Sequence, residues 1–72
     1  METSTFTLNG EYIELCNLLK LAGIANSGGQ GKLMVSDGIV VVDGNIELRR
    51  TAKIRAGQVV ECMGHKIKVI ES

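Results

Sequence analysis

The spacing of apolar residues changes from strand-like to helical within the first third of the chain. Phe6 and Leu8 alternate with threonines before Asn9-Gly10, which predicts a short strand ended by a turn. Apolar residues then recur every three or four positions, which predicts a helix over 11–22 with Gly23 as its left-handed C-cap. The predicted apolar stripe of this helix consists of Tyr12, Leu15, Leu19 and Ala22.

A second, shorter helix is predicted to begin at Ser27. Ser27 and Gln30 fit the S-x-x-Q capping box, in which each side chain binds a backbone N–H at the other end of the box. Leu33 and Met34 are expected to face the core, and Asp37-Gly38 is expected to end the helix.

The second helix contains Gly28, Gly29 and Gly31, each of which costs about 1 kcal/mol relative to alanine. One explanation is close packing against the first helix, where a side chain would not fit. The other is access of an anion to the N–H groups of the first turn. Lys32 lies on the glycine side, which favours the second explanation, although both can hold together.

From residue 39 onward the pattern is that of short strands. Ile39–Val42 and Asn45–Leu48 flank Asp43-Gly44, a dipeptide typical of a two-residue hairpin with a type I′ turn. The later strands and turns are expected at Ile54, Gly57, 59–63, Gly64-His65 and 67–70. The chain is therefore predicted to be one α+β domain spanning 1–72, with two short α-helices packed on a small, mainly antiparallel β-sheet.

The last predicted strand has two different faces. Ile67 and Val69 alternate with Lys66 and Lys68, so one sheet face should be apolar and the other basic.

The composition indicates a small folded protein of a reducing compartment. The 72 residues are 44% hydrophobic and 22% charged, with no proline. Two cysteines without CxxC spacing favour the cytoplasm over secretion. We find no leader-like start and no apolar run near ~18 residues, so neither export nor a membrane span is expected.

The formal net charge is zero, but the charges are unevenly distributed. Residues 1–48 carry a net charge of −4, and residues 49–68 carry +5. This asymmetry indicates a polyanionic partner. Basic residues on solvated strand faces would explain it equally well.

Two segments combine into a candidate anion site. Ser27–Lys32 is a glycine-rich helix start that ends in a cation, and Arg49, Arg50 and Lys53 follow the hairpin. A nucleotide-binding P-loop is excluded, because Asn26 stands where it needs glycine and Leu33 where it needs serine or threonine.

The remaining reactive side chains do not form a catalytic or metal-binding set. His65 is expected to be a solvated turn residue, and Cys16 and Cys62 are expected to be buried apolar residues. Glu11 and Glu14 lie one helix turn apart with no sign of a cleft. We expect no enzyme activity, no cofactor and no metal.

The chain resembles the S4-type RNA-binding domain, also called the αL motif. Ser27-Gly28-Gly29 with Lys32, and Arg49-Arg50 with Lys53, are similar to its small free-standing bacterial branch, the YbcJ-like and YaaA-like proteins. The wider family pattern is matched by 21–25, Ser27, 32–35, Gly38, Val40, 42–44 and Gly57. Gly28 departs from it, since arginine is frequent there.

This resemblance implies two helices and a hairpin that hold structured RNA, such as ribosomal RNA or a tRNA-like fold. The RNA contacts it implies are Ser27, Lys32, Arg49, Arg50 and Lys53, and the adjoining Gly28, Gly29 and Arg55 complete the expected RNA-binding set. We expect a monomer, with ribosome-associated proteins as further partners. The alternative is an adaptor whose basic face docks on an acidic or ribosome-associated protein.

Overall fold

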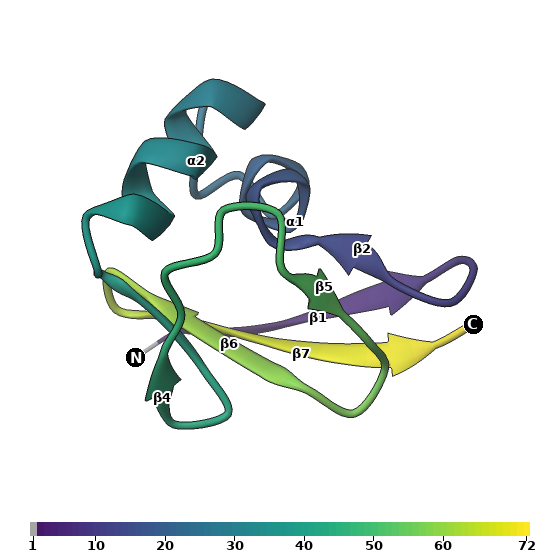
Figure 1. The fold of residues 1–72 in the computed structure, drawn as a ribbon. Coiled ribbons are helices and arrows are strands. Elements are labelled where there is room, and N and C mark those ends of the chain that lie inside the picture. Colours follow the sequence, from purple (N-terminus) through teal and green to yellow (C-terminus); the bar gives the residue numbers. More distant parts are fainter. Residues whose placement is uncertain (1) are drawn as a thin grey trace.

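Two helices cover one face of a five-stranded sheet in the computed structural model, which describes residues 2–72 (Figure 1). The helices are α1 (Leu15–Leu21) and α2 (Gly28–Ser36). The strands are β1 (Glu2–Leu8), β2 (Ile13–Glu14), β3 (Val40–Val42), β4 (Asn45–Ile46), β5 (Lys53–Ile54), β6 (Val59–Cys62) and β7 (His65–Glu71).

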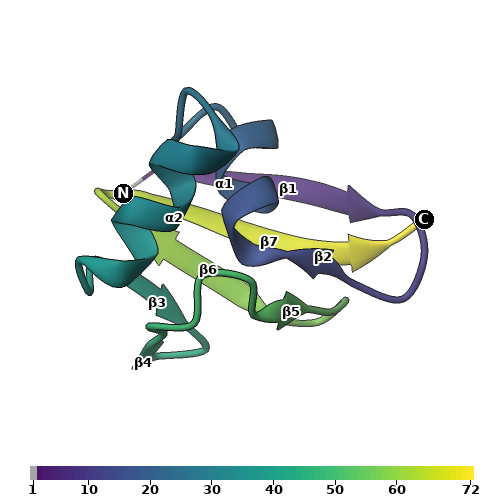
Figure 2. The ribbon, with the colours of Figure 1, turned by 45° about the horizontal axis from the view of Figure 1, so that its top comes forward.

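The main sheet has the strand order β1-β7-β6-β3-β4. The β1–β7 pair is parallel, whereas β7–β6, β6–β3 and β3–β4 are antiparallel. Strands β2 and β5 form a second, two-stranded antiparallel sheet, in which Ile13 is paired with Ile54 (Figure 2). The predicted α+β class with a mainly antiparallel sheet is confirmed.

The hairpin turns are formed by residues in the left-handed region. Asp43 and Gly44 have φ values of 50° and 84°, which confirms the predicted type I′ connection between β3 and β4. The β6–β7 turn is formed by Met63 and Gly64, with φ values of 51° and 80°. The turn predicted at Gly64-His65 therefore lies one residue earlier, and His65 is the first residue of β7.

The core lies between the helices and the inner face of the main sheet. Ile67 and Val69 are buried there, whereas the alternating Lys66 and Lys68 lie on the opposite face, as predicted. The largest fully buried side chains are Leu15, Leu18, Leu19, Val35, Val40, Ile54, Val60, Ile67 and Val69.

Helix α1 is shorter than the predicted helix over 11–22. It begins at Leu15, and the preceding Ile13–Glu14 forms a strand with β5. The periodicity was misleading at this end, and Tyr12 is 42% exposed instead of buried. The other end is one residue shorter than predicted: α1 ends at Leu21, and Ala22 is its C-cap and is exposed instead of buried. Gly23 follows Ala22 in the predicted left-handed conformation, with a φ of 80°.

Helix α2 begins with the predicted cap. Ser27 Oγ accepts a hydrogen bond from the Gln30 N–H at 3.1 Å, while Gln30 Oε1 accepts one from the Asn26 N–H instead of the Ser27 N–H. Leu33 was expected in the core but is 63% exposed. The buried side of α2 contains Gly31, and a residue two positions further along a helix points to the opposite side.

Candidate functional site

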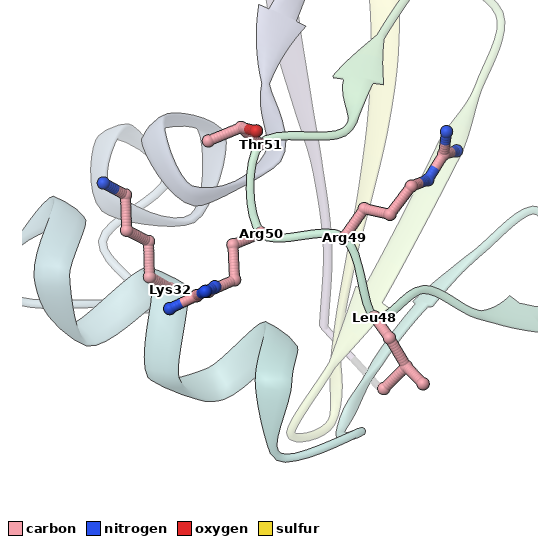
Figure 3. A pocket seen from close by; sticks show the side chains of 5 residues that line it. All are labelled: Lys32, Leu48, Arg49, Arg50 and Thr51. Atoms are coloured by element: carbon pink, nitrogen blue, oxygen red, sulfur yellow. The ribbon is translucent and has the colours of Figure 1, made fainter.

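Lys32 and Arg50 lie at one shallow hollow of about 480 Å³ on the helix side of the molecule. Figure 3 shows Arg50 extending from the 47–52 loop toward Lys32 on α2. Neither side chain forms an ion pair within 4.0 Å of a carboxylate in the described part of the chain. Two cations without a neighbouring acid create a local positive potential that favours an anion.

The backbone of the 47–52 loop holds Arg50 in place. The N–H groups of Leu15 and Cys16 donate to the carbonyl oxygens of Ala52 and Arg50 at 2.9 and 3.2 Å. These N–H groups belong to the first turn of α1, where a helix has no internal partners, and Glu14 supplies no side-chain cap. The loop therefore caps α1, and the capping bonds fix the position of Arg50.

Helix α2 contacts the same point of α1. A Cβ atom added to Gly31 would lie 2.6 Å from the carbonyl oxygen of Cys16, much closer than an atomic contact allows. Cys16 is thus the joint at which α1 meets both the loop and α2. Because Lys32 follows Gly31 directly, this contact places Lys32 beside Arg50.

Close packing does not explain the other two glycines. A Cβ atom on Gly28 would lie 3.7 Å from Asn17 Oδ1, and one on Gly29 would lie 3.8 Å from Ser27 Oγ. Both distances are ordinary van der Waals contacts, so alanine would fit at either position. The packing explanation holds for Gly31, and anion access stays a hypothesis for Gly28 and Gly29.

Arg49 does not join the Lys32–Arg50 pair. Its guanidinium binds the carboxylate of Glu47, with Nη2–Oε1 and Nε–Oε2 distances of 3.0 and 3.1 Å. These hydrogen bonds lower the pKa of Glu47 below its usual range. Figure 3 shows Arg49 pointing away from Lys32, on the other side of the loop.

Lys53 and Arg55 form a second group of cations around an aromatic ring. Lys53 Nζ lies 5.0 Å, and Arg55 Cζ 5.9 Å, from the centre of the Tyr12 ring. Lys53 also lines a second hollow with Arg49 and Thr51, so this group borders the loop. Sequence reasoning missed Tyr12 as a neighbour of these cations, because the β2–β5 pairing that brings them together is not visible in the periodicity.

The other candidate side chains show no catalytic arrangement. His65 Nδ1 lies 3.1 Å from Glu2 Oε2, so this histidine has an acidic neighbour that the sequence did not suggest. Cys16 and Cys62 are buried free thiols, and burial raises the pKa of Cys62. Residues 2–72 contain no group of three His, Cys, Asp or Glu side chains that could hold a metal ion. Neither described helix is long and apolar enough to span a bilayer.

The sequence matches a known protein family and several known proteins over most of its length. Residues 6–70 match the model of the S4 domain family. YbcJ of Escherichia coli (strain K12) is 46% identical over 68 residues, which are 93% of this chain and 97% of YbcJ. RlbA of Bacillus subtilis (strain 168), named as a probable ribosome maturation protein, is 38% identical over 58 residues, 81% of this chain and 82% of RlbA.

The fold agrees with a solved relative. The solution structure of E. coli YbcJ, described as revealing an αL motif involved in RNA binding, superimposes with a TM-score of 0.71. It is 46% identical, and the match covers 92% of this chain and 85% of that one. The resemblance inferred from the sequence is confirmed: the chain belongs to the S4 domain family and is YbcJ-like over nearly its full length.

Proposed function

We propose that this protein binds structured RNA, without catalysing a reaction, through phosphate contacts centred on Lys32 and Arg50. The observation that carries the proposal is the meeting of these two cations from separate segments, fixed by the joint at Cys16 and free of an acidic partner within residues 2–72. The RNA binding described for the αL motif of YbcJ supports it.

Each residue of the proposed site has a distinct chemical role. The planar Arg50 guanidinium can donate two parallel hydrogen bonds to one phosphate, and the Lys32 ammonium acts as a point charge. Gly28 and Gly29 leave the first-turn N–H groups of α2 accessible to a further phosphate, with Ser27 as the cap. Lys53 and Arg55 continue the positive surface along the loop.

This arrangement recognises shape more than sequence. Phosphate contacts position a protein on nucleic acid without reading bases, and the scarcity of aromatic residues disfavours single-strand recognition by stacking. Ribosomal RNA and tRNA-like folds are the proposed targets, and the ribosome maturation role in the name of RlbA is consistent with them. We propose a monomer consisting of one domain, acting in the cytoplasm.

Matched charge reversals test the site. Fluorescence anisotropy with a labelled RNA hairpin should show Kd rising about tenfold for Arg50→Glu and for Lys32→Glu, since each change adds repulsion at a phosphate contact. Lys68→Glu changes the net charge equally but lies on the open sheet face, so Kd should change less than about threefold. If Kd rose equally in all three variants, RNA would be bound by non-specific attraction to positive charge, and the proposed site would be wrong.

Salt dependence tests the mechanism independently of any substitution. With about four phosphate contacts, affinity should fall on the order of 10²-fold between 50 and 200 mM salt. An affinity that does not depend on salt would contradict phosphate binding.

The adaptor function remains a second candidate, favoured by apolar side chains at the same surface. Leu48, which lines the hollow with Lys32, is 60% exposed, and Leu33 on α2 is 63% exposed. Exposed leucines beside cations suit a protein partner as well as RNA. Purification from cells distinguishes the two functions: nuclease-sensitive material supports RNA binding, and a stoichiometric protein that survives nuclease supports the adaptor.

A further inference from the structure

Tyr12 is the aromatic neighbour of both cations of the second group. Its ring lies 5.0 Å from Lys53 Nζ and 5.9 Å from Arg55 Cζ, both within the range of a cation–π interaction. Tyr12 as a residue is 42% exposed and is not part of the buried core cluster. Its surroundings therefore favour a role at the surface.

The small β2–β5 sheet explains how this group forms. Ile13 pairs with Ile54, and Glu14 pairs with Lys53. Continuing this register places Tyr12 opposite Arg55 and diagonal to Lys53, on the face that Ile13 and Ile54 do not occupy. Arg55 Nη1 also donates to the carbonyl oxygen of Glu11 at 3.4 Å, which ties Arg55 to the segment that carries Tyr12.

Neither cation of this group forms an ion pair within residues 2–72. Glu14 is the cross-strand neighbour of Lys53, but its carboxylate accepts a hydrogen bond from Asn17 Nδ2. Within residues 2–72, neither Lys53 nor Arg55 lies within 4.0 Å of a carboxylate oxygen. Both cations are therefore open to a bound anion.

We infer that Tyr12 positions Lys53 and Arg55 as a second phosphate-binding subsite, along the loop from the Lys32–Arg50 pair. Tyr12 acts through the two cations and is a positioning residue. The subsite rests on the proposed RNA-binding function and deepens it: the bound strand contacts the protein at two separated phosphates. Arg49 and Thr51 line both the hollow at Lys32 and Arg50 and the hollow at Lys53, so the two hollows adjoin along the loop.

Affinity measurements with the labelled RNA hairpin test this role. Tyr12→Leu should weaken binding about two- to fivefold, the strength of an exposed cation–π pair, and should reduce the salt dependence by about one phosphate contact. Tyr12→Phe keeps the ring and should bind like the natural protein. In a Lys53→Gln, Arg55→Gln background, Tyr12→Leu should cause no further loss.

Two outcomes of these measurements would overturn the inference. A Tyr12→Phe variant as weak as Tyr12→Leu would assign the effect to the hydroxyl. An equal loss from Tyr12→Leu in the doubly substituted background would show that Tyr12 acts without the cations. Thermal unfolding of each variant shows whether the protein remains folded.

Nuclear magnetic resonance of the free protein separates positioning from RNA binding. The ring should shift the Lys53 Hε and Arg55 Hδ signals upfield in the natural protein and in Tyr12→Phe, and Tyr12→Leu should abolish the shift. Sodium tripolyphosphate should then perturb these signals in the two proteins that keep the ring. Ordinary shifts, or no response to tripolyphosphate, would overturn the inference. If the natural protein shows the upfield shifts and the response to tripolyphosphate but binds no hairpin RNA, the anion subsite stands and the proposed RNA-binding function is contradicted.

Discussion

The molecule carries cations on two faces, and their surroundings differ. On the open face of the main sheet, Lys66 and Lys68 alternate with buried residues, and Lys66 Nζ lies 3.8 Å from the carboxylate of Glu61. On the helix side, Lys32 and Arg50 come from separate segments and meet at a hollow without an acidic partner in the described chain.

This difference is the reason for proposing the helix-side cations, and not the sheet-face lysines, as the binding site. The sheet-face lysines are spaced by the strand repeat and would lie there in any strand of this sequence. The helix-side pair exists because the backbone of Cys16 binds the Arg50 carbonyl and packs against Gly31. The first arrangement is local and the second depends on tertiary contacts, so the two should respond differently to substitution.

The largest expected effect comes from breaking the joint without changing any charge. Gly31→Ala forces a methyl group against the Cys16 carbonyl, and overpacking of this kind costs about 1–3 kcal/mol, only partly offset by better helix propensity. Each 1 kcal/mol should lower Tm by about 4–8 °C in a domain of this size. Hairpin binding should also weaken, because Lys32 moves away from Arg50.

Gly29→Ala is the matched control in the same helix. Its added methyl group has room, and alanine favours a helix over glycine by up to about 1 kcal/mol. The free energy of unfolding, and with it Tm, should therefore stay the same or rise. If Gly31→Ala and Gly29→Ala had the same Tm, the joint at Cys16 would not determine the site.

A smaller effect is expected from adding a cation to each face. Gly28→Arg places a guanidinium at the start of α2, where an added Cβ atom makes only an ordinary contact with Asn17, and should tighten hairpin binding about threefold. Thr5→Arg adds the same charge beside Lys68 on the sheet face and should have little effect. Equal gains in the two variants would mean that net charge, and not position, controls binding.

The smallest change in RNA affinity is expected at Arg49, which is already paired with Glu47. Glu47→Gln releases Arg49 from its ion pair and should tighten hairpin binding about twofold, because a free guanidinium borders the site. Glu61→Gln releases Lys66 on the sheet face with the same change in charge, and anisotropy should show no gain. A gain confined to Glu61→Gln would place the binding surface on the sheet.

Local signals in the sequence were sufficient for the Asp43-Gly44 turn and for one hydrogen bond of the capping box, whereas the β6–β7 turn lies one residue before its predicted place. Asp43-Gly44 adopts the predicted left-handed turn, and Ser27 accepts the predicted hydrogen bond from Gln30. These features depend on a few neighbouring residues, so short motifs predict them. The segment before Leu15 was predicted as helix because its spacing suits a helix, but pairing with the distant β5 made Ile13–Glu14 a strand.

The residue types of the candidate site were predicted from the sequence, and so was the meeting of the 27–32 and 49–53 segments, but the neighbours of each cation were not. Lys32 and Arg50 come together, whereas Arg49 is bound by Glu47, and Lys53 and Arg55 surround Tyr12. The sequence shows which residues are basic, but it does not show which carboxylates and aromatic rings will be their neighbours. Likewise, the contact that explains Gly31 involves the backbone of Cys16, which no side-chain pattern reveals.

Chemical-shift mapping tests the central claim most directly. An RNA hairpin would be titrated into the isotope-labelled protein while the backbone amide signals are followed. We predict the largest changes at residues 28–32 and 49–55, with small changes at the exposed positions of β7. The largest changes at Lys66 and Lys68, or equal changes on both faces, would contradict the account.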